Sequence, residues 1–445
     1  MSGDLTAPSA FAWVSGIYDY LEHDMIIKEI AEIQLNMRYK PELAACVQRS
    51  GLRASLGRVA LYRVELDNGV VGYGDGTGVP DDVSAFVGRD AFIGLRQIAH
   101  GGVQMALYDA VGKALGVPAH QLMGKQVRDR VPFAYWSCCL SPEEWARQVE
   151  QAAALGYRVY KFKCRPWWDP IEQIEAVAKV APPGFTCWLD FNGHLREVRQ
   201  ALPVLRELDR YDCVGGFESP MPQRDGEGYR QLRAKLDKPI AAHYGGGCCH
   251  VRSDPTFDRG VSAVDQIARG LCDGFVLGGG HVQGVLDRAA VAQEAKLPFW
   301  IQVVGTGLRA AWVVHLASVC RQATLSSLAA HNIWDRDFAL SPSPVAGFAA
   351  VPEGPGLGVE VDEAMVAELG QAEPLEIGRE ITTVVHPDGV KWHFASEQQR
   401  HETFYFGSAP GFVRGVRLET RADDGSADFD DLFRRCKEAP VLEGK

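Results

Sequence analysis

The segment from Val159 to Asp190 reads VYKFKCRPWWDPIEQIEAVAKVAPPGFTCWLD and contains the pattern that decides the fold. Two short apolar runs, Val159 to Lys163 and Thr186 to Asp190, have the length and β-rich composition of buried strands. Between them, Asp169-Pro170 supplies a capping residue and a first-position proline, which is typical of a helix start. Strand, helix and strand in this order predict one parallel β/α unit.

The same alternation extends to both sides of this segment, and helix starts such as Ser141-Pro142-Glu143-Glu144 support its register. The strand candidates are Val131 to Trp136, Val159 to Lys163, Thr186 to Asp190, Val214 to Glu218, Pro239 to His243, Gly274 to Leu277, Pro298 to Val303 and Ser326 to Ala330. Eight such strands predict an α/β protein with a modified β/α (TIM-like) barrel over residues 130–345.

Residues 1–129 have a different pattern. The β-rich run Val59 to Val64, the turn Asp67-Asn68-Gly69 and the run Val70 to Tyr73 predict a hairpin. The segment Gly102 to Leu115 has apolar residues at helical spacing, and Gly116-Val117-Pro118 ends it. We therefore expect a smaller N-terminal α+β domain beside the barrel.

Bulk properties narrow the class of partner. The formal net charge of -11 disfavours nucleic acid or an anionic membrane surface as the partner and favours a small molecule.

Met1 to Gly16 has no basic segment followed by an apolar run, and no stretch reaches the ~18 apolar residues of a membrane span. Eleven scattered cysteines do not form a secreted disulfide framework. We expect a cytoplasmic protein.

Polar side chains end four consecutive strand candidates. Lys163, Asp190, Glu218 and His243 each stand at the carboxyl end of an apolar run, about one β/α unit apart. In a β/α barrel these ends meet on one face. A buried charge is costly unless it is paired or bound to metal, so the repetition predicts a functional site. Lys161 shares the strand face of Lys163, where two uncompensated cations would repel.

At this point the chain resembles the enolase superfamily, and within it the mandelate racemase and muconate lactonizing enzyme group. The motifs are Tyr160 to Lys163, Trp188 to Asn192, Phe217 to Pro220, the helix Ala106 to Pro118, and Pro355 to Glu363. The resemblance implies that residues 1–129 are a capping domain and that residues 346–445 complete the cap and add a tail. It also implies an enzyme that removes the proton beside a substrate carboxylate with help from a divalent metal.

The resemblance assigns roles to the strand-end residues. Lys163 corresponds to the base, Lys161 to the group that holds the substrate carboxylate, and Asp190 and Glu218 to metal ligands, with magnesium as the expected ion. The third ligand, usually a carboxylate, falls at His243. A histidine ligand makes the site softer, so manganese, iron or zinc are alternatives to magnesium.

The opposite side of the expected pocket has no base that matches the family pattern. Gly278 stands where some relatives carry a lysine, and Gln302 lies near the position of a histidine base in others. His281, His194 and Tyr244 are the candidate acids on the same rim. One strong base with one weak acid favours dehydration of a hydroxy or sugar acid by a lyase. A racemase, epimerase or cycloisomerase, and a catalytically inactive binding homologue, remain alternatives.

Other features of the sequence indicate no further cofactor. Cys248-Cys249-His250 lacks the ligand spacing of a zinc site, so we interpret it as structural. The two Gly-Gly-Gly runs lack the fingerprint of a nucleotide-binding loop. The expected partners are a small-molecule carboxylate substrate and further copies of the chain in a homo-oligomer, with no nucleic acid and no membrane.

Overall fold

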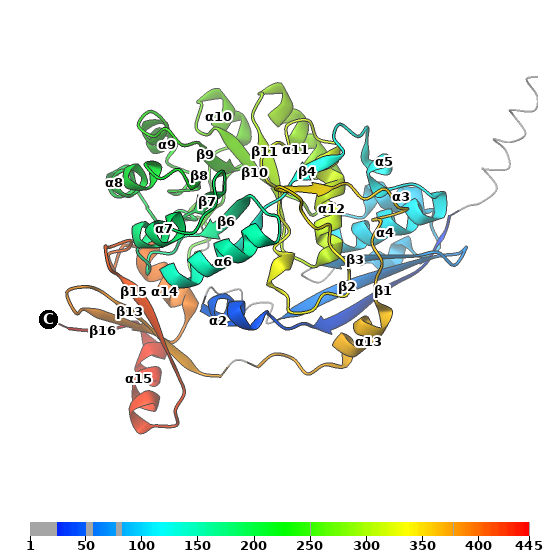
Figure 1. Cartoon of the computed structure of the whole chain (residues 1–445). Coiled ribbons are helices and arrows are strands. Elements are labelled where there is room, and N and C mark those ends of the chain that lie inside the picture. Colours follow the sequence, from blue (N-terminus) through cyan, green and yellow to red (C-terminus); the bar gives the residue numbers. More distant parts are fainter. Residues whose placement is uncertain (1–24, 50–56, 77–81, 250, 377, 445) are drawn as a thin grey trace, which may run out of the picture.

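The computed structural model describes residues 25–49, 57–76, 82–249, 251–376 and 378–444. The segment Met1 to Gly16 and His250, both considered above, lie outside the described residues. Figure 1 shows the N-terminal sheet beside the barrel, and a C-terminal unit at the other side of the molecule.

The N-terminal part is an antiparallel sheet of β1 (Ile27–Asn36), β2 (Arg58–Leu66) and β3 (Val71–Gly76), in that order. The predicted hairpin is confirmed, with Gly69 at a φ of 81° in its turn. Helix α4 (Gly101–Leu115) crosses the sheet closely, because a Cβ on Gly72 would lie 2.1 Å from the Ala106 carbonyl oxygen. The shorter helices of this part are α2 (Pro41–Arg49), η2 (Val83–Phe86), α3 (Ala91–Gln97) and α5 (Ala119–Met123).

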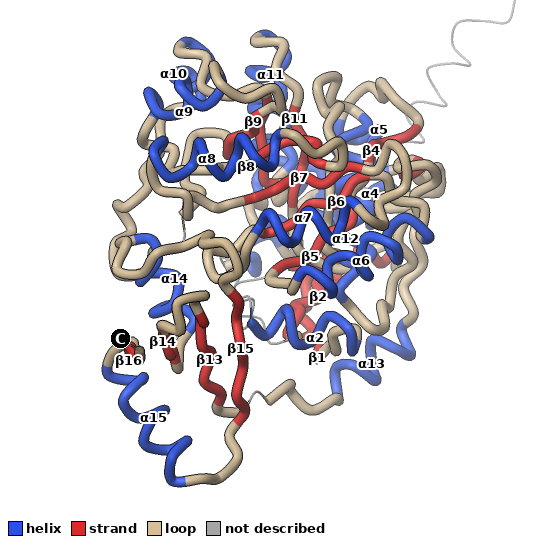
Figure 2. Tube along the Cα trace, turned by 60° about the vertical axis from the view of Figure 1, so that its left-hand side comes forward, coloured by secondary structure: helices blue, strands red, loops and turns tan. Residues whose placement is uncertain are grey.

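The central part is a curved parallel sheet with helices on its outer face (Figures 1 and 2). Its strands, in spatial and chain order, are β5 (Tyr135–Cys138), β6 (Val159–Lys163), β7 (Thr186–Asp190), β8 (Val214–Glu218), β9 (Ile240–His243), β10 (Gly274–Gly278) and β11 (Phe299–Gln302). The helices are α6 (Pro142–Ala154), α7 (Pro170–Ala178), α8 (Val198–Asp209), α9 (Gly226–Arg233), α10 (Ala263–Ala268), α11 (Val282–Glu294) and α12 (Gly307–Ser318). The capping box predicted at Ser141 is present.

Barrel closure differs in detail from the prediction. The expected strand Ser326 to Ala330 appears only as two isolated parallel bridges, one between Gln302 and Leu328 and one between Phe133 and Ser327. The expected strand Val131 to Trp136 is divided, because β4 (Arg130–Pro132) pairs with β12 (Phe348–Ala350) and β5 begins at Tyr135. Ala330 then adopts a φ of 51° and leads into the turn η3 (His331–Ile333), so the closing segment stays short.

Apolar side chains fill the barrel below its polar strand ends. Ala241, Val276 and Trp300 form a buried cluster with Trp188 and Leu325, and the Trp188 and Trp300 rings are 5.1 Å apart. Side chains alternate along a strand, so the residue two positions after each of the four strand residues Trp188, Ala241, Val276 and Trp300 points into the same interior space. Those residues are Asp190, His243, Gly278 and Gln302, which end their strands.

The C-terminal region contains a helix beside the N-terminal sheet and a separate sheet with two helices. Helix α13 (Glu363–Gln371) contacts β1 of the N-terminal sheet. An antiparallel sheet follows, in the order β15 (Arg417–Ala422), β13 (Glu380–Val385), β14 (Lys391–Phe394) and β16 (Val441–Glu443), with helices α14 (Glu397–Tyr405) and α15 (Ala427–Glu438). This C-terminal unit packs on the loop after β6, where Trp167 and Trp168 join Phe404 in one buried cluster.

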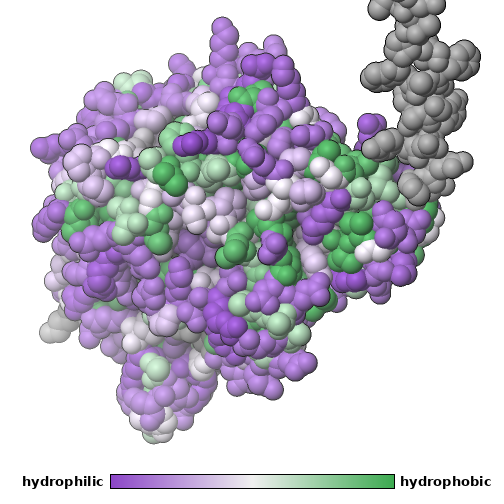
Figure 3. Space-filling model, turned by 45° about the vertical axis from the view of Figure 1, so that its right-hand side comes forward, coloured by the Kyte–Doolittle hydropathy of each residue, from purple (hydrophilic) through white to green (hydrophobic). Residues whose placement is uncertain are grey.

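The surface is mainly hydrophilic on the face shown in Figure 3, and its hydrophobic residues form separate patches. Among the residues that the structure describes, no helix has the length and apolar character that crossing a bilayer requires.

Candidate active site

The lysine pair of β6 meets the carboxylates of β7 and β8 at the carboxyl ends of the strands. Lys161 is buried, with its Nζ 2.8 Å from Asp190 Oδ2 and 3.1 Å from Glu218 Oε2. Lys163 contacts the same Asp190 oxygen and keeps 13% of its side chain exposed. The parallel register aligns Lys163 with Asp190 and Asp190 with Glu218, which brings these charges together. The prediction that these strand ends converge is therefore confirmed.

Burial and mutual charge set the protonation of this cluster. Burial would raise the pKa of Asp190, but Lys161 and Lys163 outweigh it and hold that pKa well below its ordinary value. Burial would lower the pKa of Lys161, but Asp190 and Glu218 raise it above its ordinary value. Lys163 differs, because burial lowers its pKa to about 8 against the opposing effect of Asp190. Lys161 thus stays an ammonium, and Lys163 is the easier of the two to deprotonate.

Glu218 is the member of the cluster with the poorest hydrogen bonding. Its side chain is fully buried, yet neither carboxylate oxygen accepts a hydrogen bond from the described residues, despite the 3.1 Å approach of Lys161. Burial, together with the charge of Asp190, raises the pKa of Glu218 to about 8. A buried carboxylate without donors is costly, so this position favours a cation.

His243 extends the cluster toward solvent. Its Nε2 lies 3.5 Å from Glu218 Oε1, and its Nδ1 lies 3.1 Å from Ser219 Oγ. The side chains of Gln223 and Gln266 donate hydrogen bonds to the His243 carbonyl oxygen and fix the end of β9. A hydrogen bond to one ring nitrogen leaves the other suited to metal ligation, as is common for histidine ligands.

The donor atoms of this cluster suit a divalent cation. Asp190 and Glu218 offer carboxylate oxygens, His243 offers a ring nitrogen beside them, and Glu218 has hydrogen-bonding capacity to spare. Among the described residues, one group of three such ligand atoms lies within 4.8 Å of one another, and it is in a different part of the chain. The ligand atoms of Asp190, Glu218 and His243 are therefore spread more widely than this. Lys161 Nζ lies between the two carboxylates, 2.8 Å from Asp190 Oδ2 and 3.1 Å from Glu218 Oε2.

The three candidate acids are placed differently. His281 begins α11 on the rim, where its Nδ1 accepts a hydrogen bond from the Gly284 amide at 3.2 Å. The Tyr244 ring packs 5.2 Å from Phe275, under Arg288 of α11, which turns it toward the helix layer. Tyr244 is therefore turned away from the cluster, whereas His281 lies in the loop between β10 and α11.

His194 is turned toward the C-terminal unit. Its Nδ1 lies 2.8 Å from the Phe191 carbonyl oxygen and its Nε2 lies 2.9 Å from His401 Nδ1 of α14. Its ring also stacks on Tyr405, with centroids 4.0 Å apart. The structure therefore does not bring His194 together with the lysine pair, although His194 follows Asp190 by only four positions.

Two residues of the site were missed in the sequence. Gln302, at the end of β11, accepts a hydrogen bond from Lys161 at 2.8 Å. Its position two residues after the inward Trp300 was a usable signal, but we treated it only as the place of an absent base. Tyr405 donates a 2.6 Å hydrogen bond to the Asn192 carbonyl oxygen, next to Asp190. No local pattern indicated this contact, since the two residues lie far apart in the chain.

The fold and site together define a capped β/α-barrel enzyme with a lysine and carboxylate centre at its strand ends. Residues 144–365 match the family model described as Enolase C-terminal domain-like. The chain is 31% identical to a D-galactonate dehydratase of Verminephrobacter eiseniae (strain EF01-2), over 61% of this chain and 74% of that protein. It is 28% identical to a D-gluconate dehydratase of Thermoproteus tenax, over 62% of this chain and 56% of that protein. The chain belongs to the enolase superfamily.

Solved structures agree on the fold. A muconate lactonizing enzyme from Pseudomonas fluorescens, complexed with muconolactone, superposes with a TM-score of 0.60 at 20% identity, covering 78% of this chain and 100% of that one. An N-succinyl Arg/Lys racemase from Bacillus cereus ATCC 14579 gives 0.61 at 19% identity, covering 78% and 98%. The resemblance to the mandelate racemase and muconate lactonizing enzyme group, inferred from the motifs, is confirmed. About a fifth of the chain has no counterpart in these neighbours.

Proposed function

We propose that this enzyme removes the proton α to a carboxylate and eliminates water from a hydroxy or sugar acid. The observation that carries the proposal is the convergence of Lys161 and Lys163 on Asp190, beside a buried Glu218 that lacks hydrogen-bond donors. Two relatives named D-galactonate dehydratase and D-gluconate dehydratase support the choice of a sugar acid.

In this proposal the two lysines have different roles: one binds the substrate and the other removes the proton. Lys161 remains charged because Asp190 and Glu218 raise its pKa, so it holds the substrate carboxylate. Lys163, whose pKa burial lowers to about 8, takes the α-proton onto Nζ. The carbon–oxygen bond at the β-position then breaks, and a proton from an acid on the rim converts the leaving hydroxyl to water. His281 is the acid that we place there.

Asp190, Glu218 and His243 would hold one divalent cation in this proposal. When bound, it supplies positive charge that stabilises the negative charge on the substrate carboxylate. Magnesium is the ion that superfamily members typically bind, and the histidine ligand favours manganese, iron or zinc as alternatives. Metal analysis of protein purified without added metal, compared with His243→Ala, tests the role of His243. We expect occupancy to fall about 10-fold or more, and unchanged occupancy and identity would remove His243 from the site.

The opposite wall of the barrel supports elimination over racemisation. Gly278 and Gln302 end β10 and β11, and neither side chain can accept or deliver a proton as a second strong base. A racemase, epimerase or cycloisomerase is the second candidate function, favoured by the position of His281 on the rim.

The decisive experiment is a screen of hydroxy and sugar acids in deuterated water, with magnesium, manganese or zinc added. We expect formation of a keto acid from at least one sugar acid, and its loss in Lys163→Met. Exchange of the α-proton without keto acid formation would instead support the second candidate. Binding without exchange under any metal would leave only an inactive binding homologue.

The cellular setting is part of the same proposal. All eleven cysteines are free thiols, which supports a reducing compartment, and we propose the cytoplasm. Assembly into a homo-oligomer stays a prediction, which light scattering of the purified protein would test.

A further inference from the structure

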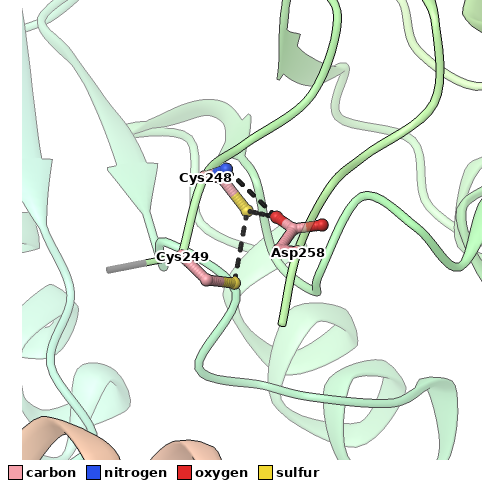
Figure 4. A group of neighbouring side chains, drawn as sticks. All are labelled: Cys248, Cys249 and Asp258. Carbon is pink, nitrogen blue, oxygen red and sulfur yellow. Dashed lines mark hydrogen bonds between the residues drawn. The ribbon is translucent and has the colours of Figure 1, made fainter. Parts of the chain in front are cut away.

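A second cluster of metal-ligating side chains lies in the loop between β9 and α10. Cys248, Cys249 and Asp258 direct two sulfur atoms and a carboxylate toward one another (Figure 4), and their ligand atoms all lie within 4.8 Å. The adjacent cysteines alone lacked the spacing of a zinc site, and the fold supplies Asp258 as the third ligand. The cluster shares no residue with the lysine and carboxylate centre.

The distances suit tetrahedral coordination by sulfur. Cys248 Sγ and Cys249 Sγ are 3.7 Å apart, and Cys248 Sγ lies 3.1 Å from Asp258 Oδ2. Two thiolates on a tetrahedral zinc, each bonded at ~2.3 Å, lie about 3.8 Å apart, and a thiolate and a carboxylate oxygen lie about 3.5 Å apart. The separation of the two sulfur atoms, and that of Cys248 Sγ and Asp258 Oδ2, are therefore close to those of a zinc site, so these atoms can bind zinc without a change in the backbone.

Neighbouring loops hold the three side chains in place. The backbone amides of Arg224 and Cys248 donate to the two oxygens of Asp258, at 3.1 and 3.0 Å, which fixes the carboxylate plane. Gly193, in the loop after β7, leaves the space that the sulfurs occupy. A Cβ there would lie 2.2 Å from Cys249 Sγ and 3.4 Å from Cys248 Sγ. Such outer support is what orients the ligands of a metal site.

We propose that Cys248, Cys249 and Asp258 bind one thiophilic divalent cation, with zinc as the expected ion and water in the fourth position. Binding breaks two sulfur–hydrogen bonds, forms two sulfur–metal bonds and releases two protons to solvent. Burial raises the pKa of the Cys248 thiol well above its ordinary value, so the metal-free protein holds that proton. Cys249 is partly exposed and gives the ion access.

The ligand chemistry separates this site from the one at the strand ends. Asp190 and Glu218 offer only oxygen, whereas the loop site offers two sulfurs. A metal ion whose bond to a thiolate gives an absorption band therefore detects binding at the loop site and not at the strand ends. Cobalt(II) is such a probe, because its thiolate complexes show a charge-transfer band that oxygen ligands do not give.

The test is a cobalt titration of the reduced, chelator-treated full-length protein. We expect a thiolate band in the wild type that persists in Asp190→Asn, where it saturates at one equivalent because the competing strand-end site is weakened. Cys249→Ser should weaken binding by about 100-fold or more and abolish most of the band, whereas Cys213→Ser, a buried cysteine elsewhere in the barrel, should retain it. Absence of the band in the wild type, or its full retention in Cys249→Ser, would overturn the proposal.

An alkylation experiment keeps the proposal testable if a variant fails to fold. Wild-type protein is treated with iodoacetamide with and without two equivalents of zinc, enough for both proposed sites, and the cysteine peptides are quantified by mass spectrometry. We expect zinc to slow alkylation of Cys249 by about 10-fold or more, and to leave Cys436 of the C-terminal unit unaffected. Equal alkylation of Cys249 in both samples would contradict a zinc site.

Discussion

The two walls of the barrel mouth differ in charge and in hydrogen bonding. The wall formed by β6, β7 and β8 ends in Lys161, Lys163, Asp190 and Glu218, which contact one another as a buried charged cluster. The wall formed by β10 and β11 ends in Gly278 and Gln302, which carry no charge. Among the described residues, the neutral wall joins the cluster through the hydrogen bond that Lys161 donates to Gln302.

This difference limits the reactions that the site can perform. Racemisation by two bases needs proton acceptors on both faces of the substrate carbon, and the strand ends supply them on one face only. Elimination needs one strong base and one weaker acid, which matches the asymmetry. The four changes below alter one wall at a time.

The largest effect is expected for the charged wall, at Lys163. Lys163→Met removes the proposed base while keeping the length of the side chain, so we expect kcat to fall about 10³-fold or more. Initial rates of keto acid formation measure the effect, with Lys179→Met on an exposed helix end as the control. Activity within a few-fold of wild type would show that another group takes the proton.

Replacing Glu218 should weaken metal binding but raise the stability of the metal-free protein. Glu218→Gln removes a buried carboxylate that lacks donors, so the metal-free fold should gain about 1–3 kcal/mol in free energy of unfolding. Metal affinity should fall about 100-fold, because one anionic ligand is lost. Urea unfolding with and without the divalent ion measures both quantities. A variant that loses stability without metal would contradict our description of Glu218.

A smaller effect is expected where the neutral wall touches the charged one. Gln302→Leu removes the acceptor for Lys161, a hydrogen bond to a charged group worth about 1.5–3 kcal/mol, so kcat/KM should fall about 10-fold or more. Gln302→Glu preserves an acceptor and should lose less activity. If both variants behave alike, the hydrogen bond does not position Lys161.

The smallest effect is a gain of function on the neutral wall. A Cβ on Gly278 meets no atom within 4 Å, so Gly278→Lys has room for a second base. We expect slow exchange of the α-proton in substrate epimers that the wild type leaves unchanged, monitored by proton NMR in deuterated water. Gly278→Ala should show no such exchange. Equal exchange in both variants would mean that the new amine does not reach the substrate.

Local patterns in the sequence were sufficient for most of the barrel. Short apolar runs identified β6 to β11 to within a residue or two, because each run has the length of a strand and is bounded by turn or helix-capping residues. The closing segment Ser326 to Ala330 was harder. Its two bridges depend on contacts with Phe133 and Gln302, which no local window contains.

The site residues likewise fall into two groups: those that local sequence patterns predict and those that depend on contacts between distant segments. Lys163, Asp190 and Glu218 were predictable, because each ends an inferred strand and the register of a parallel sheet aligns them, and Lys161 followed because it shares the strand face of Lys163. His194 was a candidate only because it follows Asp190 by four positions, and it faces His401, since a folded C-terminal unit packs on the loop after β7. That packing joins segments that are distant in sequence, so it could not be inferred from spacing. Tyr405 and Asp258 were missed for the same reason.

The most direct test is a crystal structure of the protein with manganese and a bound hydroxy acid, using anomalous scattering to locate the ion. We expect one manganese peak within ~2.0–2.3 Å of oxygens from Asp190 and Glu218, with Lys163 Nζ directed at the carbon beside the substrate carboxylate. Substrate bound with no ion between those two carboxylates, and Lys163 still paired with Asp190, would contradict the account.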